Sequence, residues 1–231
     1  MPKQKNSATR LKAPRLGNRE RIIEAAIELM NIYGSSVGTA QIADHTGISP
    51  GSLYYHFRDF SDIALVVFDR MRTELAATLA MPPFGAISAP QLVAYYSGGA
   101  QVLWRYRFAV SAGRELTSRN SDLAESYRDF TLDGIEAVRC ILENVFEHHP
   151  GGIRVSKSDC ALLAENSWVL WSAWPRHAET KNRSSRTSAP EIAKGLQQVA
   201  MTIAPYLDRK YYDAVNDGLI TYVSSLEGKF D

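Results

Sequence analysis

Apolar residues recur at helical intervals along most of the chain. Before Gly34 they follow each other at spacings of three and four residues, which gives a helix one buried face. Asn18 is a candidate N-cap for this helix, and Gly34 has the backbone freedom that a C-terminal stop requires. The apolar positions are Ile22, Ile23, Ala26, Ile27, Leu29, Met30 and Tyr33.

A shorter helix and a tight turn are expected next. The helix runs from Thr39 to Thr46 behind Gly38, which is a permissive N-cap. Gly47 ends it in a left-handed conformation, and Ile48 fills the turn from the inside. The positions expected to pack inward are Ala40, Ile42 and Ala43.

The helix after the turn has the stronger start signal. Ser49 can cap it, and Pro50 suits the first helical position. Leu53 and Phe57 lie four residues apart, so they should anchor its inner face. A fourth helix is then expected from about Ser61 to Leu79, behind the candidate cap Asp59.

The outward positions of this third helix carry small or polar-tipped residues. Gly51 and Ser52 keep its first turn narrow, so the backbone can approach a duplex closely. The hydroxyls of Tyr54 and Tyr55 and the imidazole of His56 can donate to phosphate oxygens. The layout is that of a helix-turn-helix DNA reader, whose second helix enters the major groove. The alternative is an all-helical protein that does not bind DNA, in which the same aromatic residues pack against a core.

The segment Gly47–Phe57, GISPGSLYYHF, resembles the recognition-helix signature of the TetR family of bacterial transcription regulators. The likeness covers roughly residues 19–68. It implies that Thr39 touches phosphate, that a first group of residues faces base edges or the adjacent backbone, and that a second group holds phosphates. The first group is Ser49, Pro50, Gly51 and Ser52, and the second is Tyr54, Tyr55 and His56, with Arg58 as a further cation.

Two positions depart from the family pattern. Phe60 stands where family members often carry a lysine that contacts phosphate, and Arg58 is the cation available to compensate. Gly38 replaces the usual Thr or Ser cap of the second helix. Together with the short Ser52, these departures leave a second hypothesis open, namely a ligand-binding or interaction module whose degenerate head does not bind DNA.

Positive charge is concentrated at the N-terminus. The whole chain has a net charge of +1, yet residues 1–21 hold seven Lys or Arg and a single Glu, so the remainder is acidic. Pro2, Pro14 and Gly17 indicate that residues 1–18 form an arm that is disordered until it binds. A basic arm suits a clamp on the minor groove or on phosphates, and the alternative is a solubilising tail.

The resemblance implies a bacterial protein, and the composition favours a cytoplasmic one. The 231 residues, 45% of them hydrophobic, can bury a substantial core. No apolar run reaches the ~18 residues of a membrane span, and no apolar stretch follows the basic N-terminus as in a secretory signal. Cys140 and Cys160 lie on separate expected helices and are interpreted as reduced, buried thiols.

Helical spacing continues through the rest of the chain. Breaks are expected at Met81–Gly85, at His148–Gly152 and over the polar segment Glu179–Ser188, and Pro205 is expected to kink the last main helix. New helices are expected to begin near Ser88, at Asn120 or Ser121, at Ser156 or Ser158, at Ser188 and near Lys210.

Several segments of this body resemble one subset of TetR-family regulators. They are WRYRF (Trp104–Phe108), Arg114–Arg128, Trp168–Trp174 and Gly195–Leu207. The resemblance implies a homodimer that pairs through helices around residues 160–178 and 190–207, and a small-molecule site between helices. Candidate wall residues, for which core packing is the alternative, are Trp104, Arg107, Trp168, Trp171 and Trp174.

No motif indicates an enzyme, a metal site or a cofactor. The adjacent His148 and His149 would diverge by about 100° on a helix and make a poor chelate. We therefore predict an all-α protein with a basic arm (1–18), a helix-turn-helix domain (19–65) and an effector-binding and dimerisation domain (66–231). Its predicted partners are double-stranded operator DNA, a second copy of the chain and an unidentified small-molecule effector that releases it as a repressor; no membrane partner is expected.

Overall fold

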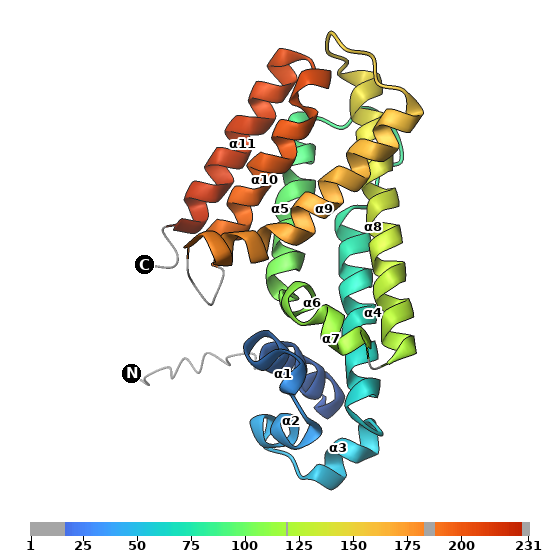
Figure 1. The fold of residues 1–231 in the computed structure, drawn as a ribbon, viewed down its shortest axis with the longest axis vertical. Coiled ribbons are helices and arrows are strands. Elements are labelled where there is room, and N and C mark those ends of the chain that lie inside the picture. The colour runs from blue at the N-terminus through green and yellow to red at the C-terminus, as the bar shows by residue number, and fades with distance from the viewer. Residues whose placement is uncertain (1–16, 119, 183–187, 228–231) are drawn as a thin grey trace, which may run out of the picture.

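The computed structural model describes residues 17–118, 120–182 and 188–227. The arm expected over residues 1–18 lies almost entirely outside these ranges. The described residues form α-helices and two 3-10 turns, which confirms the all-α fold. In Figure 1 a small head of α1 (Asn18–Tyr33), α2 (Thr39–Thr46) and α3 (Pro50–His56) lies below a larger body, and α4 (Phe60–Thr78) passes from one to the other.

The body is a bundle in which α4 packs along α8, and α9 lies between α8 and α10. α5 contacts α4, α10 and α11, so it lines the centre of the bundle. Its helices are α5 (Ala89–Arg105), α6 (Phe108–Ser111), α7 (Gly113–Ser118), α8 (Ser121–His148), α9 (Lys157–Asn182), α10 (Ala189–Ile203) and α11 (Arg209–Glu227).

The head is held together by the apolar faces that the spacing identifies. The side chains of Ile22, Ile42, Leu53 and Phe57 are all buried, so each head helix contributes to one core. The inward orientation predicted for Ala40 is wrong: it lies two residues, about 200° of helical turn, from Ile42 and is exposed.

Both ends of α1 differ from the prediction. Gly17 occupies the N-cap position rather than Asn18, and the Asn18 side chain instead accepts a hydrogen bond of 3.1 Å from Arg21. Tyr33, expected on the buried face, is the last residue of the helix and is exposed. Gly34 ends the helix with φ of +62°, as its permissive backbone predicts, before a 3-10 turn over Gly34–Ser36.

Most predicted helix starts are confirmed by a side-chain cap. The carboxylate of Asp59 accepts from the backbone of Asp62, and Asn120 rather than Ser121 accepts from the backbone of Leu123. The hydroxyls of Ser156 and Ser188 cap α9 and α10 in the same way.

The C-terminal half of α9 contradicts the predicted loop. The helix continues past Pro175 to Asn182, so the loop expected over Glu179–Ser188 is wrong for its first four residues, and 183–187 lie outside the described part. Buried packing of Trp168 and Ala178 on either side of Pro175 offsets the backbone hydrogen bond that proline removes. Pro205 does not kink α10, because α10 ends at Ile203 and a 3-10 turn follows over Ala204–Tyr206.

The two cysteines are free thiols, and they differ in burial. Cys160 is buried, and burial raises its pKa to about 11, which keeps it protonated and unreactive. Cys140 is only partly buried, so the expectation of two buried thiols is half correct.

Candidate DNA-binding surface and effector cavity

The turn between α2 and α3 has the geometry that presents a recognition helix. Gly47 adopts φ of +66° and ψ of 34°, a left-handed conformation that favours glycine. The backbone N–H of Ile48 donates to the carbonyl of Ala43 over 3.0 Å, which closes the end of α2. The Ser49 hydroxyl then accepts from the backbone of Ser52 over 3.2 Å and starts α3 as predicted.

The outward face of α3 is polar-tipped and open. Leu53 and Phe57 are buried and fix the rotation of the helix, whereas the tyrosines beside them point away from the core. Tyr54 is 53% exposed and Tyr55 is 86% exposed. The ring of His56 lies edge-on to that of Tyr55, with centroids 5.1 Å apart. Pro50 and Gly51 are also exposed, so the leading turn of the helix is open to a ligand.

A hydroxyl pair joins the start of α2 to α3. The side chains of Thr39 and Tyr54 lie 3.2 Å apart, oxygen to oxygen, so the two predicted phosphate contacts belong to one hydrogen-bonded group. Gly38 has no side chain to cap α2, and Gln41 instead accepts from the Gly38 N–H over 2.9 Å. The α2 end is thereby ordered without the usual Thr or Ser.

Arg58 is tied to a carboxylate rather than free. Its guanidinium makes two hydrogen bonds to Asp62, of 2.8 and 2.7 Å, and its backbone N–H donates to the same group over 3.0 Å. The Arg58 guanidinium holds the pKa of Asp62 below its usual range. Phe60 is half-buried and packs on the core, which gives a structural role to the residue at this position.

Two arginines counted with the arm belong to the folded head. Arg21 donates to the carbonyl of Thr46 and so connects α1 to the end of α2. The Arg19 guanidinium lies over the Phe57 ring, 5.3 Å from its centroid, at the C-terminal end of α3. Charge counting alone places both cations near DNA, but only the fold fixes Arg19 beside the recognition helix.

The head and body meet through a cluster of ion pairs, the junction cluster, which consists of Glu20, Glu24, Arg70, Glu74 and Arg105. The guanidinium of Arg70 lies 2.6 Å from Glu20 and 2.9 Å from Glu24, oxygen to nitrogen. Arg105, at the end of α5, pairs with Glu24 over 2.7 Å and with Glu74 over 3.5 Å. Arg70 holds the pKa of Glu20 below its usual value, so the pair is formed at neutral pH.

Two neutral side chains extend this junction. The Tyr106 hydroxyl donates to Glu74 over 2.9 Å, and burial raises the pKa of Tyr106, which keeps it a donor. Asn31 of α1 donates to the carbonyl of Arg105 over 2.8 Å and accepts from the backbone of Phe108 over 3.0 Å. Sequence reasoning missed these residues, because their partners are 74 or more positions away for Asn31 and 32 away for Tyr106.

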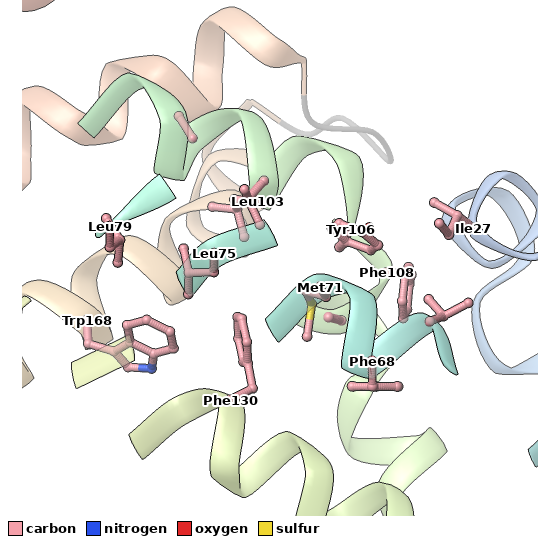
Figure 2. Packing of buried hydrophobic residues seen from close by; sticks show 14 of the residues in the cluster. Ile27, Phe68, Met71, Leu75, Leu79, Leu103, Tyr106, Phe108, Phe130 and Trp168 are labelled. Atoms are coloured by element: carbon pink, nitrogen blue, oxygen red, sulfur yellow. The ribbon is translucent and has the colours of Figure 1, made fainter. Parts of the chain in front are cut away.

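An apolar cavity of about 60 Å³, the upper cavity, lies inside the body between α4, α5, α8, α9 and α10. It is lined by Leu75, Leu79, Leu92, Tyr95, Tyr96, Gly99, Val138, Ile141, Leu142, Ser167, Trp168, Trp171 and Val199. A lower cavity of about 20 Å³ shares Trp168 and Trp171 with it and reaches Met71 and Tyr106. Figure 2 shows the line of α4 side chains from Leu79 through Leu75 and Met71, with Trp168 facing them.

The five candidate effector residues do not come together. Trp168 and Trp171 line both cavities. Trp104 does not; its ring is covered by the Arg107 guanidinium, 4.3 Å from the centroid. Trp174 donates through its indole nitrogen to the carbonyl of Glu191 over 2.7 Å and so joins α9 to α10.

The described residues contain no group of three or more His, Cys, Asp or Glu side chains arranged to hold a metal ion. Within 17–118, 120–182 and 188–227, none of the helices combines the length and hydropathy that crossing a bilayer requires.

Two family models match the chain. One, described as bacterial regulatory proteins of the tetR family, matches residues 22–64, which hold α2, α3 and most of α1. The other, described as bacterial transcriptional repressor, matches residues 70–215 and therefore most of the body. No curated protein matches the chain.

The chain is also similar to solved structures. A TetR-family transcriptional regulator from Marinobacter aquaeolei VT8 is 25% identical with a TM-score of 0.78, over 91% of this chain and 99% of that one. A TetR regulator from Legionella pneumophila is 16% identical (TM-score 0.66, 82% and 99%), and a gamma-butyrolactone receptor, an ArpA like protein, is 18% identical (TM-score 0.60, 90% and 96%). The last two likenesses concern the fold alone. The matched models, the helix-turn-helix geometry and the helical body together show that this chain belongs to the TetR family of bacterial transcriptional regulators.

Proposed function

We propose that this regulator is a homodimeric repressor that leaves its operator when a small molecule enters the cavities beside Trp168 and Trp171. The observation that supports DNA binding most directly is the outward face of α3. Tyr54 and Tyr55 are exposed on it, whereas Leu53 and Phe57 are buried on the opposite face. In this proposal, residues 19–65 bind DNA and residues 66–231 bind the effector and the second copy, with the arm of residues 1–18 as an additional clamp.

The proposed DNA contacts divide into two kinds. Ser49, Pro50, Gly51 and Ser52, at the leading turn of α3, face base edges or the nearby backbone. Thr39, Tyr54, Tyr55 and His56 hold phosphates, and the hydrogen bond between Thr39 and Tyr54 supports a shared role. Arg58 contributes a cation when a phosphate competes with Asp62 for its guanidinium.

Dimerisation through α9 and α10 is supported by apolar side chains on their solvent side. Leu162 and Val169 of α9 are exposed, as is Met201 of α10, and apolar residues at these positions suit a self-complementary contact. A two-fold dimer would present its α3 helices to successive major grooves, roughly 34–36 Å apart.

The junction cluster is the proposed route from effector to head. Tyr106 lines the lower cavity with its ring and donates to Glu74 with its hydroxyl, so it joins the cavity wall to the ion pairs on α1. An occupant that displaces this ring would disturb the contacts of Arg105 with Glu24 and Glu74. A coupling of about 1–3 kcal/mol is sufficient to change operator affinity many-fold.

Binding of the purified chain to its own upstream DNA, measured by fluorescence anisotropy at increasing salt, tests the DNA-binding step. Each phosphate that the protein neutralises adds about 0.9 to the steepness of log affinity against log salt, so a steep fall is expected. Affinity that barely changes with salt would favour an interaction module that does not bind DNA.

A matched pair of variants assigns the contact surface. Tyr54→Phe removes a hydroxyl proposed to hold phosphate, and it should weaken binding to all duplexes alike. Tyr33→Phe is the control, because Tyr33 is another head tyrosine with the same 53% exposure but lies on α1. Equal losses in the two variants would remove Tyr54 from the interface.

A further inference from the structure

The walls of the two cavities carry no charge. None of their lining residues is Asp, Glu, Lys, Arg or His, and most are aliphatic or aromatic. A buried ion without a partner is strongly disfavoured in such surroundings. The chemistry of an occupant is therefore decided by the few polar atoms of the wall and by their hydrogen bonds.

Four of the wall hydroxyls already have their hydrogens engaged. In the upper cavity, Tyr95 donates to the carbonyl of Ala80 over 2.9 Å, and Ser167 donates to the carbonyl of Leu163 over 2.7 Å. In the lower cavity, Tyr106 donates to Glu74 over 2.9 Å, and Ser172 donates to the carbonyl of Val169 over 3.2 Å. The hydroxyls of Tyr96 and Tyr127 can donate or accept, so they do not favour either kind of ligand group. Indole N–H groups, in contrast, can only donate.

The indole N–H of Trp168 is an unpaired donor. Trp168 is only 7% exposed, and its Nε1 has no hydrogen-bond partner among the described residues. Every fully enclosed side-chain nitrogen or oxygen in the described part does have one, so this Nε1 must border open space. Trp168 lines both cavities, so they can supply that space.

The packing of the ring agrees with this orientation. The Cε3, Cζ3 and Cη2 edge of Trp168 lies against Gly134 of α8. Nε1 is on the other side of the indole, away from that helix. Trp171, the second indole common to both cavities, also has no hydrogen-bond partner for its Nε1 in the described part, and this nitrogen lies beside Gly99 of α5.

We propose that the cavities take an uncharged, largely apolar molecule that carries a carbonyl- or ether-type oxygen, and that this oxygen accepts a hydrogen bond from Trp168 Nε1. This assignment rests on the proposed function, because it names the ligand class of the effector site. Trp168 and Trp171 line both cavities, so a ligand in either cavity contacts them. Even the upper cavity, at about 60 Å³, is smaller than the ~150 Å³ that accommodates benzene.

Three probes of similar size test two requirements of the proposal separately, namely that the ligand is uncharged and that it carries an acceptor oxygen. Acetophenone is uncharged and has a carbonyl oxygen, cumene has nearly the same shape without an acceptor, and benzoate is an anion. Their dissociation constants for the full-length protein are measured by ligand-observed NMR, which requires no tryptophan signal. Both neutral probes should bind, and benzoate should bind more weakly than acetophenone.

The contribution of the Trp168 hydrogen bond to probe affinity is measured by comparing variants. Trp168→Phe keeps an aromatic ring and removes the N–H, so it should lower the ratio of the cumene constant to the acetophenone constant by about 3- to 10-fold. Acetophenone and cumene differ in hydration, but this difference is the same for the variant and the parent protein, so it cancels when the two ratios are compared. Trp104→Phe is the control, because Trp104 lies outside both cavities, and it should leave the ratio unchanged.

Gly99→Ala tests whether the probes bind in the upper cavity, which Gly99 lines. Its methyl group would project at the cavity wall, 3.7 Å from Trp171 Nε1, and should weaken both neutral probes. An unchanged ratio in Trp168→Phe, benzoate binding as tight as that of acetophenone, or no binding of either neutral probe would each overturn the proposal. Operator binding measured without any probe is a separate readout: its failure would overturn the repressor function while leaving probe binding to decide the ligand class.

Discussion

Two glycines that border the same tryptophan pair should respond oppositely to alanine. At Gly134, an added Cβ would lie 2.0 Å from Cζ3 and 2.2 Å from Cη2 of Trp168, far inside contact distance. The Trp168 ring cannot move away freely, because Phe130 and Trp171 lie 5.4 and 5.2 Å from it, centroid to centroid. At Gly99, the nearest atoms to an added Cβ are 3.7 and 4.0 Å away, which is ordinary contact.

The expected change in the free energy of unfolding is the sum of a backbone-entropy gain and an overpacking penalty. Replacing a helical glycine by alanine gains about 0.5–1 kcal/mol of backbone entropy at either site. Overpacking at Gly134 adds a penalty of about 1–3 kcal/mol, so Gly134→Ala should be destabilising by roughly 0.5–2 kcal/mol. Gly99→Ala has no such penalty and should be stabilising by about 0.5–1 kcal/mol. For a chain of this size, each kcal/mol moves the midpoint by about 2–4 °C.

Thermal unfolding followed by circular dichroism, at one fixed protein concentration, measures both variants. Concentration must be fixed, because dimerisation stabilises the folded state by mass action. The expected order of midpoints is Gly99→Ala, then the parent protein, then Gly134→Ala. A Gly134→Ala midpoint at or above that of Gly99→Ala would falsify the reasoning, since it would mean that the Trp168 ring is not confined.

Three further outcomes are expected. Ser49→Ala removes the cap of α3 and should lower the free energy of unfolding by about 0.5–2 kcal/mol, measured by urea titration. Asp62→Asn releases Arg58 from its ion pair, so it should raise affinity for duplexes of any sequence and steepen the salt slope by about one; unchanged anisotropy curves would show that Arg58 does not approach phosphate. Arg70→Met should destabilise the protein at pH 7 and much less at pH 3. The Glu20 pKa is lowered in the folded state, so its pair with Arg70 stabilises above the unfolded pKa and is lost as pH falls through the folded pKa; a loss of stability independent of pH would contradict this.

The local signals in the sequence were sufficient for the bounds of α2 and α3, but not for the cap of α1 or for the orientation of Tyr33 and Ala40. Ser49, Pro50 and Gly47 are start and stop residues whose effect is confined to a few neighbours, so α2 and α3 could be predicted with their bounds. The junction cluster could not, because the pair of Arg105 and Glu24 joins residues 81 positions apart. Nothing in the spacing of either helix identifies that contact.

The tryptophans show the same limit within one helix. Trp168, Trp171 and Trp174 are each three residues apart, so each step falls about 60° short of a full turn. Trp168 consequently packs on Gly134 of α8, Trp171 on Gly99 of α5 and Trp174 on Gly195 of α10. Residues that look equivalent in the sequence therefore meet three different helices, and only two of them line the cavities.

This arrangement equips the protein with built-in optical reporters. Indole emission is sensitive to local polarity, and the three α9 indoles each report on a different neighbouring helix. In variants that each retain only one of these three tryptophans, the time course of fluorescence after effector addition would show which side of α9 moves first.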